Sequence, residues 1–155
     1  MSGMKILIER PGISANQKAS NAYQQLGRLL SALELKVLPA DTIDFIDREI
    51  EQLNAVPGID RNFVKATKAC QQRIIRTVEK KHKIVPRNYY RQLWMLLGMS
   101  VFGIPIGAAF GASSGNMGML GIGLPIGMAI GIGVGTNMDR KALNEGRQLD
   151  VEIKN

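Results

Sequence analysis

The chain has 155 residues, one cysteine, 17 glycines and a formal net charge of +7, with 21% charged residues and a mean hydropathy of −0.02. Such averages are typical of one small, soluble, basic domain, but the distribution of charge excludes that interpretation. Residues 92–138 contain no Asp, Glu, Lys, Arg or His, and this run of 47 positions holds 12 of the 17 glycines. One helix needs roughly 20 apolar residues to cross a bilayer, so the run predicts two transmembrane helices. The lone cysteine and the charged start of the chain argue against a secreted, disulfide-bonded protein.

The first part of the chain predicts a short arm and three amphipathic helices. We expect an N-terminal arm over residues 1–14, and then a helix over 15–37 capped by Ser14. Apolar residues recur every three or four positions after Asp41 or Thr42, which predicts a second helix that ends at Pro57-Gly58. A third helix begins at Asp60 and runs to about residue 83. Residues 15–85 thus predict a small cytoplasmic bundle, and a core this thin usually needs a further element or self-association.

The positive charge is concentrated immediately before the uncharged run. Residues 61–91 carry ten Lys or Arg against one acid, whereas residues 1–60 sum to −2 and residues 139–155 to zero. Such a bias beside a membrane span predicts the side that stays in the cytoplasm. We therefore expect a hairpin in the inner (cytoplasmic) membrane with both termini cytoplasmic. Anionic lipid headgroups are the expected partners of Lys80, Lys81 and Lys83. Nucleic acid is disfavoured, because Phe63 is the only aromatic residue in 61–88.

Aromatic residues cluster where the charged segment meets the uncharged run. Two tyrosines and the only tryptophan fall within six positions, next to two arginines. Aromatic rings and arginines at such a boundary are typical of the membrane interface, although an ordinary helix start with core aromatics remains an alternative. The predicted interfacial anchor comprises Arg87, Tyr89, Tyr90, Arg91 and Trp94.

An internal repeat is the most specific feature of the uncharged run. Residues 102–111 match residues 122–131 at every Gly and Pro, and each copy continues with glycine at every fourth position. Glycine costs about 1 kcal/mol relative to Ala inside a soluble helix, whereas in lipid it permits close helix packing. The predicted packing or pore-lining residues are Gly103, Gly107, Gly111, Gly115, Gly123, Gly127, Gly131, Gly135, Pro105 and Pro125. We expect a hairpin over 86–138 with helices at 92–112 and 119–138, a turn at Gly115-Asn116, and a cytoplasmic tail over 139–155.

Residues 89–150 resemble the uncharacterised bacterial glycine-zipper membrane proteins, whose mark is a hairpin of paired G-x-x-x-G-x-x-x-G helices. The motifs that carry the resemblance are Gly103 to Gly115 and Gly123 to Gly135. The resemblance covers about two fifths of the chain. It implies an all-α membrane protein, in which an N-terminal cytoplasmic helical domain precedes a two-helix transmembrane hairpin. It says little about activity, because glycine zippers occur in pore-forming and in purely structural proteins.

Residues for catalysis or cofactor binding are few. His82 is the only histidine and lies between two lysines, so we expect it to be solvated, and Cys70 is expected to be buried in a helix. The glycines do not have dinucleotide or phosphate-loop spacing. We therefore predict no enzyme, no cofactor, no metal and no small-molecule substrate, and any conduction would be passive because the run has no ionisable group.

A homo-oligomeric channel or pore is the leading functional prediction, and two alternatives stay open beside it. In the channel, glycine faces pack hairpins around an axis and the cytoplasmic domain assembles or gates them. The first alternative is a membrane-anchored interaction or scaffold module without a pore, in which the two glycine faces meet within one hairpin. The second alternative is an effector that permeabilises a membrane in defence or competition.

Overall fold

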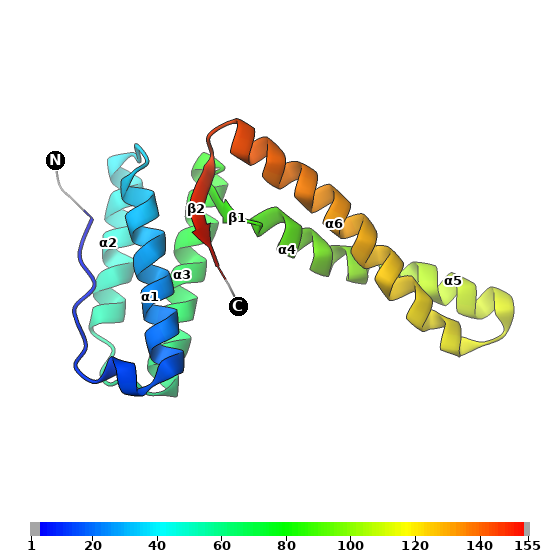
Figure 1. Ribbon diagram of the computed structural model, residues 1–155, viewed down its shortest axis with the longest axis horizontal. Coiled ribbons are helices and arrows are strands. Elements are labelled where there is room, and N and C mark those ends of the chain that lie inside the picture. The colour runs from blue at the N-terminus through cyan, green and yellow to red at the C-terminus, as the bar shows by residue number, and fades with distance from the viewer. Residues whose placement is uncertain (1–3, 154–155) are drawn as a thin grey trace. The chain divides into compact units, whose positions relative to one another are not determined.

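The computed structural model describes residues 4–153 and divides them into two compact units. The first, here called the helical unit, comprises residues 4–86 together with Leu149–Ile153, and the second, the hairpin unit, comprises Arg87–Gln148. The fold is all-α apart from one pair of short strands (Figure 1). Each unit is described by itself below.

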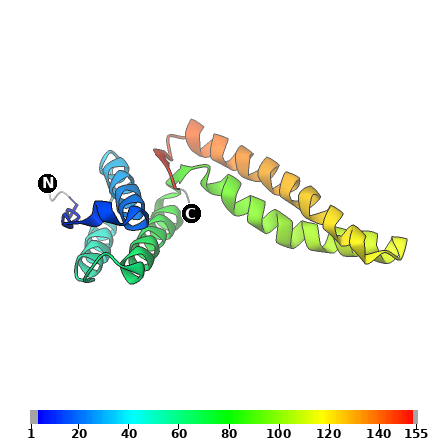
Figure 2. The same cartoon turned by 60° about the horizontal axis from the view of Figure 1, so that its bottom comes forward.

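The helical unit contains three antiparallel helices, α1 (Gln17–Glu34), α2 (Ala40–Asn54) and α3 (Arg61–His82) (Figures 1 and 2). Asp60 caps α3 as the sequence suggests, since its carboxylate accepts hydrogen bonds from two backbone N–H groups, each at 3.0 Å. The prediction for Ser14 is wrong. A short 3₁₀ turn, η1 (Ile13–Ala15), occupies that position, and the side chain of Asn16 caps α1 by accepting from the N–H of Ala19 at 3.2 Å.

The core of the helical unit consists of the apolar stripes of the three helices. Each stripe recurs at the three- to four-residue spacing that places side chains on one helix face. Burial of each such side chain stabilises the fold by about 1.5–3 kcal/mol. The most deeply buried apolar side chains are Leu26, Leu29 and Leu33 from α1, Ile46 and Ile50 from α2, and Phe63, Cys70, Ile74 and Val78 from α3.

A two-stranded sheet adds to this core. Strand β1 (Val85–Arg87) pairs with β2 (Gln148–Glu152), which returns from the far end of the sequence. Leu149 and Val151 are buried in β2 and alternate with exposed acids, which is the period of a strand with one covered face. Residues 139–153 therefore do not form the separate tail that the sequence predicts for residues 139–155. They complete a helix as far as Asn144 and then supply a strand to the helical unit.

The hairpin unit consists of two long helical arms. The first arm runs through α4 (Tyr89–Gly98), a π-helical segment η2 (Met99–Gly103) and α5 (Ile104–Ser114). A turn and the 3₁₀ segment η3 (Met117–Met119) lead into α6 (Leu120–Asn144), which runs antiparallel beside the first arm (Figure 2). Both arms are long and apolar enough to cross a membrane by length and composition, with 26 residues in Tyr89–Ser114 and 28 in Met117–Asn144.

Polar contacts hold the N-terminal arm against α2 and the residues that follow it, and Arg10 makes several of them. Two nitrogens of the Arg10 guanidinium donate to four carbonyl oxygens at the C-terminal end of α2 and just beyond it, at 2.6–3.1 Å. The guanidinium also lies over the Phe63 ring, 4.3 Å from its centroid. The last carbonyls of a helix lack a donor four residues on, and a cation favours the negative end of the helix dipole. The carbonyl of Leu53 also accepts from the N–H of Val56 at 3.1 Å. Arg10 thereby joins the arm, α2 and α3.

Replacing Arg10 by Ala should lower the free energy of unfolding of the helical unit by about 2–3 kcal/mol, because the carbonyls, three of them in part-buried hydrogen bonds, lose a charged donor. Cys70 supplies the readout for a urea titration of the full chain in detergent. It is 1% exposed and burial raises the pKa of its thiol to about 12, so it reacts with a thiol reagent only after unfolding. Arg48→Ala is the control, since Arg48 is exposed and its one hydrogen bond is to the carbonyl of Asp44 in its own helix. Equal midpoints for the two variants would contradict this role of Arg10.

Candidate functional site: the glycine-lined hairpin

The two arms of the hairpin meet along glycines. Seven glycines lie where a Cβ atom would reach the backbone of the opposite arm, within about 3 Å of it. A Cβ on Gly135, for example, would be 2.5 Å from the Cα of Arg91, and one on Gly123 would be 2.6 Å from the Cα of Gly107. Backbone cannot move aside as a flexible side chain can, so only glycine fits. The seven are Gly98, Gly103 and Gly107 on the first arm and Gly123, Gly127, Gly131 and Gly135 on α6.

Two other predicted glycines have different positions. Gly111 contacts the turn segment, with its Cβ position 3.4 Å from the Sδ of Met117. Gly115 does not take part in the packing between the arms, because it ends α5 with a positive φ of 66° and its Cβ would meet no described atom within 4 Å. Its role is that of the αL residue at a helix C-terminus. The sequence analysis missed Gly98, which lies five residues before Gly103 and so falls outside the four-residue series.

The π-helical segment explains how Gly98 joins the glycine face. The N–H of Ile104 donates to the carbonyl of Met99, five residues back, so η2 accommodates one residue more per turn than an α-helix. This places Gly98 and Gly103 on the same face despite their five-residue spacing. Pro105 follows directly, and its ring would crowd the carbonyl four residues back in a regular α-helix. Pro125, its counterpart in the repeat, lies inside α6 without such a segment.

An aspartate closes the open end of the hairpin. Asp139, on α6, is 6% exposed, and its carboxylate accepts from the backbone N–H groups of Tyr90 at 3.1 Å and Arg91 at 2.9 Å. These are among the first N–H groups of α4, which have no partner within the helix. Asn88 precedes α4 but gives it no side-chain cap. Asp139, on the opposite arm, thus takes the role that a local N-cap residue would have for α4. It also fixes the register at which the arms meet.

The predicted interfacial residues lie at this same open end. Tyr90 is buried, and its ring packs edge-on against that of Tyr89 with centroids 5.3 Å apart. Trp94 is half-buried and Arg91 is exposed. Arg87 is exposed as well. Aromatic and basic side chains therefore share one end of the hairpin unit, whereas the turn at the other end is uncharged.

Of the predicted headgroup-binding lysines in the helical unit, two are engaged within the protein. Lys81 pairs with Asp41 at 2.7 Å, and Lys83 lies 3.7 Å from Glu79. Lys80 is exposed. The expectation that His82 is solvated is wrong, because it is half-buried and its Nε2 lies 2.9 Å from the hydroxyl oxygen of the fully buried Thr42.

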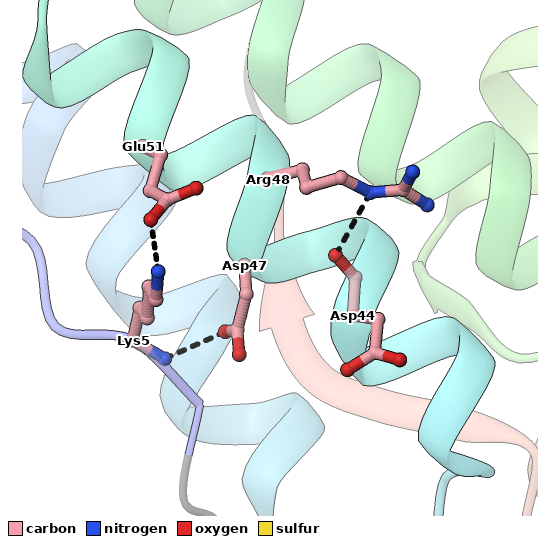
Figure 3. A pocket seen from close by; sticks show the side chains of 5 residues that line it. All are labelled: Lys5, Asp44, Asp47, Arg48 and Glu51. Atoms are coloured by element: carbon pink, nitrogen blue, oxygen red, sulfur yellow. Dashed lines mark hydrogen bonds and ion pairs between the residues drawn. The ribbon is translucent and has the colours of Figure 1, made fainter.

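The helical unit also has a shallow charged pocket of about 460 Å³, lined by Lys5, Asp44, Asp47, Arg48 and Glu51 (Figure 3). Lys5 accounts for its main contacts, since its backbone N–H donates to Asp47 at 2.7 Å and its ammonium pairs with Glu51. The pocket thus surrounds the point where the arm attaches to α2. Among residues 4–153, no three His, Cys, Asp or Glu side chains are grouped so as to hold a metal ion.

No known protein family, characterised protein or solved structure matches the chain. The glycine-lined interface and its closure by Asp139 are therefore the features from which a function has to be argued.

Alanine at Gly131 should disrupt the hairpin, whereas alanine at Gly133 should not. A Cβ at Gly131 would lie 2.7 Å from the carbonyl carbon of Trp94, but one at Gly133 would meet no described atom within 4 Å. Overpacking of this kind typically costs about 1–3 kcal/mol. Trp94, the only tryptophan, reports on this contact, so its fluorescence in a denaturing-detergent titration gives the midpoint. An unchanged midpoint for Gly131→Ala, or an equal loss for Gly133→Ala, would contradict the glycine interface.

Loss of the Asp139 carboxylate should expose the start of α4. In Asp139→Ala, the amides of Tyr90 and Arg91 lose their shared acceptor, and the cost is about 1–2 kcal/mol by analogy with other cap deletions. These amides should then exchange with deuterium about 5- to 30-fold faster in detergent micelles. Arg140→Ala serves as the control because Arg140 is the exposed neighbour. Exchange that is unchanged at Tyr90 and Arg91 would show that the carboxylate does not hold α4.

Proposed function

We propose that this protein is a membrane-anchored module, in which the hairpin unit crosses the bilayer twice and holds the helical unit at one membrane surface. The observation that carries the proposal is the separation of side chains on the hairpin, with glycines between the arms and large apolar residues outside. Only 17% of the most apolar window of each arm is buried, unlike the core helix of a soluble protein. The large exposed apolar residues include Leu93, Leu96, Leu97, Val101, Phe102, Ile104, Phe110, Ile122, Ile126, Ile130 and Val134.

The dimensions of the hairpin support two membrane spans. At 1.5 Å rise per residue, arms of 26 and 28 residues are about 39 and 42 Å long, against a hydrocarbon core of about 30 Å. The surplus length suits the interfaces, where Tyr89, Tyr90 and Trp94 would lie at headgroup level. Basic residues lie where the chain enters and leaves the hairpin, Arg91 and Arg140 among them, and both places are at the open end. They favour a cytoplasmic location for that end. The uncharged turn is the part that can be translocated at the lowest cost.

An anchor is favoured over a pore because the glycine faces are occupied within one hairpin. Gly103, Gly127 and their neighbours contact the opposite arm and not the outside. A ring of hairpins would need another adhesive face on each copy. The surface left over is largely apolar, as lipid contact requires, and offers few groups that could line a water-filled path.

A homo-oligomeric channel is the second candidate, and one observation favours it. Gly121, Ala129 and Gly133 are exposed on α6 at multiples of four residues, so one line of small side chains remains outside the hairpin. Small residues at that spacing permit a further helix to approach closely. A membrane-permeabilising effector would use the same surface.

A cysteine-accessibility experiment tests the anchor. Asn116→Cys, in the turn, and Arg140→Cys, at the open end, should react with a membrane-impermeant thiol reagent from opposite sides of sealed vesicles. The native Cys70 stays silent because it is buried. Labelling of both sites from one side, or release of the protein by alkaline carbonate, would refute the anchor.

Flux measurements distinguish the second candidate. Proteoliposomes containing the full chain should retain ions and small dyes, and the detergent-solubilised protein should be monomeric. Flux through the unsubstituted protein that disappears in Gly121→Leu and Gly133→Leu would instead support an oligomeric pore. A Cβ at either glycine would meet no described atom within 4 Å. These substitutions leave the interface between the arms untouched, so they do not simply unfold the hairpin.

A further inference from the structure

Two apolar side chains project fully into solvent from the loop between α1 and α2. Leu35 is 86% exposed and Val37 is 102% exposed. The N–H of Lys36 donates to the carbonyl of Leu33 at 2.9 Å, and Leu38, only 8% exposed, attaches the loop to the core. The loop therefore holds two large apolar groups away from the helical unit, where they have no described partner that would justify the cost of their exposure to water.

This loop lies at the end of the helical unit where the chain leaves the unit. The start of α2 lies beside the end of α3, since Asp41 pairs with Lys81 and Thr42 contacts His82 at 2.9 Å. Three residues after α3, strand β1 begins at Val85, and the helical unit ends at Pro86. The loop at 35–39, the end of α3 and the exit of the chain thus share one end of the helical unit (Figure 1).

Basic residues accompany the apolar pair at this end. Lys36 separates Leu35 from Val37, and Lys80 is exposed in the last turn of α3. Glu34, directly before Leu35, is also exposed, and Lys36 and Lys80 together outweigh its charge. Apolar side chains beside such lysines suit an anionic bilayer surface, where the former enter the boundary of the acyl chains and the latter meet the headgroups. A protein partner fits less well, because two side chains on a convex loop provide far less than the roughly 800 Å² per partner of a stable protein interface. Lipid requires no complementary groove.

We propose that Leu35 and Val37 insert into the interfacial layer of the same membrane that the hairpin crosses. The proposal rests on the proposed function, because the hairpin would keep this end of the helical unit within reach of the bilayer. The apolar loop contacts lipid, and Lys36 and Lys80 bias this contact toward anionic headgroups. The hairpin then supplies the covalent anchor, and the loop orients the helical unit on the surface.

The test places an environment-sensitive fluorophore at position 37 of the full chain through Val37→Cys. Ile6→Cys provides a matched control, because Ile6 is as exposed as Leu35, at 86%, but lies on the arm that packs along α2. Both variants change exposed side chains, so the fold should tolerate them, and buried Cys70 remains unlabelled. The protein is reconstituted in vesicles of phosphatidylcholine with or without phosphatidylglycerol, and part of the lipid carries a spin label near the headgroup.

We expect the emission of the probe at position 37 to shift to shorter wavelength and to be quenched by the spin-labelled lipid, more strongly with phosphatidylglycerol. The probe at position 6 should show neither effect. Equal behaviour at the two positions would overturn the insertion. A blue shift that grows with the ratio of protein to lipid, without quenching by lipid, would also overturn it and would indicate a second copy of the chain as the occupant.

The accessibility of Asn116→Cys, measured on the same preparation, separates the two proposals. If the turn is translocated and the probe at position 37 is not quenched, the anchor stands and the insertion fails. If the turn is not translocated, the anchor itself fails.

Discussion

The structure of the hairpin depends on direct backbone contact between its two arms. At Gly98, Gly127 and Gly131 there is no space for even one methyl group between one helix and the next. This proximity allows many weak dispersion contacts to accumulate along the interface, which matters in lipid because no hydrophobic drive joins helices there. It also imposes a register, and the irregular parts of the hairpin follow from that register. The π turn at η2 restores the glycine face before Pro105, and the Asp139 carboxylate on the other arm accepts hydrogen bonds from the first amides of α4.

This use of glycine bears directly on function. A glycine face that is covered by the other arm is not available to a neighbouring protein, and the hairpin therefore presents mainly its large apolar side chains to its surroundings. The repeat in the sequence admits both arrangements, since copies of a G-x-x-x-G motif pack equally well within one chain or between chains. In the structure the glycines of one arm pack against the other arm of the same chain, and this pairing is the basis on which we propose the anchor. The line through Gly121 and Gly133 leaves the hairpin a route to self-association.

The helices could be predicted from the sequence because their signals are local. The start after Asp41 or Thr42, the Pro57-Gly58 break, Asp60 and the apolar stripes place α2 and α3 to within a few residues. The predictions failed where the determining contact is distant. Asn16 and not Ser14 is the N-cap of α1, because the turn after Gly12 shifts the start of the helix. Asp139 looked like the first residue of a tail, since nothing in its neighbourhood indicates that it caps a helix 49 positions earlier. Gly98 lies outside the four-residue series, and only the π turn brings it onto the glycine face.

The strand pair could not be predicted from local sequence patterns either. Its pairing restricts the number of membrane crossings that the proposed anchor can make. Leu149, Val151 and Ile153 alternate with acids over a stretch too short to distinguish a strand from a tail. Their burial shows that the chain leaves the helical unit after Pro86 and re-enters it at Leu149. Because β1 and β2 are hydrogen-bonded to each other, the two ends of the hairpin unit are held together on one side. If the hairpin unit is the membrane anchor that we propose, a chain tied in this way has to cross the bilayer an even number of times. The two arms meet that condition without any further segment, and a single span would break the sheet that completes the core of the helical unit.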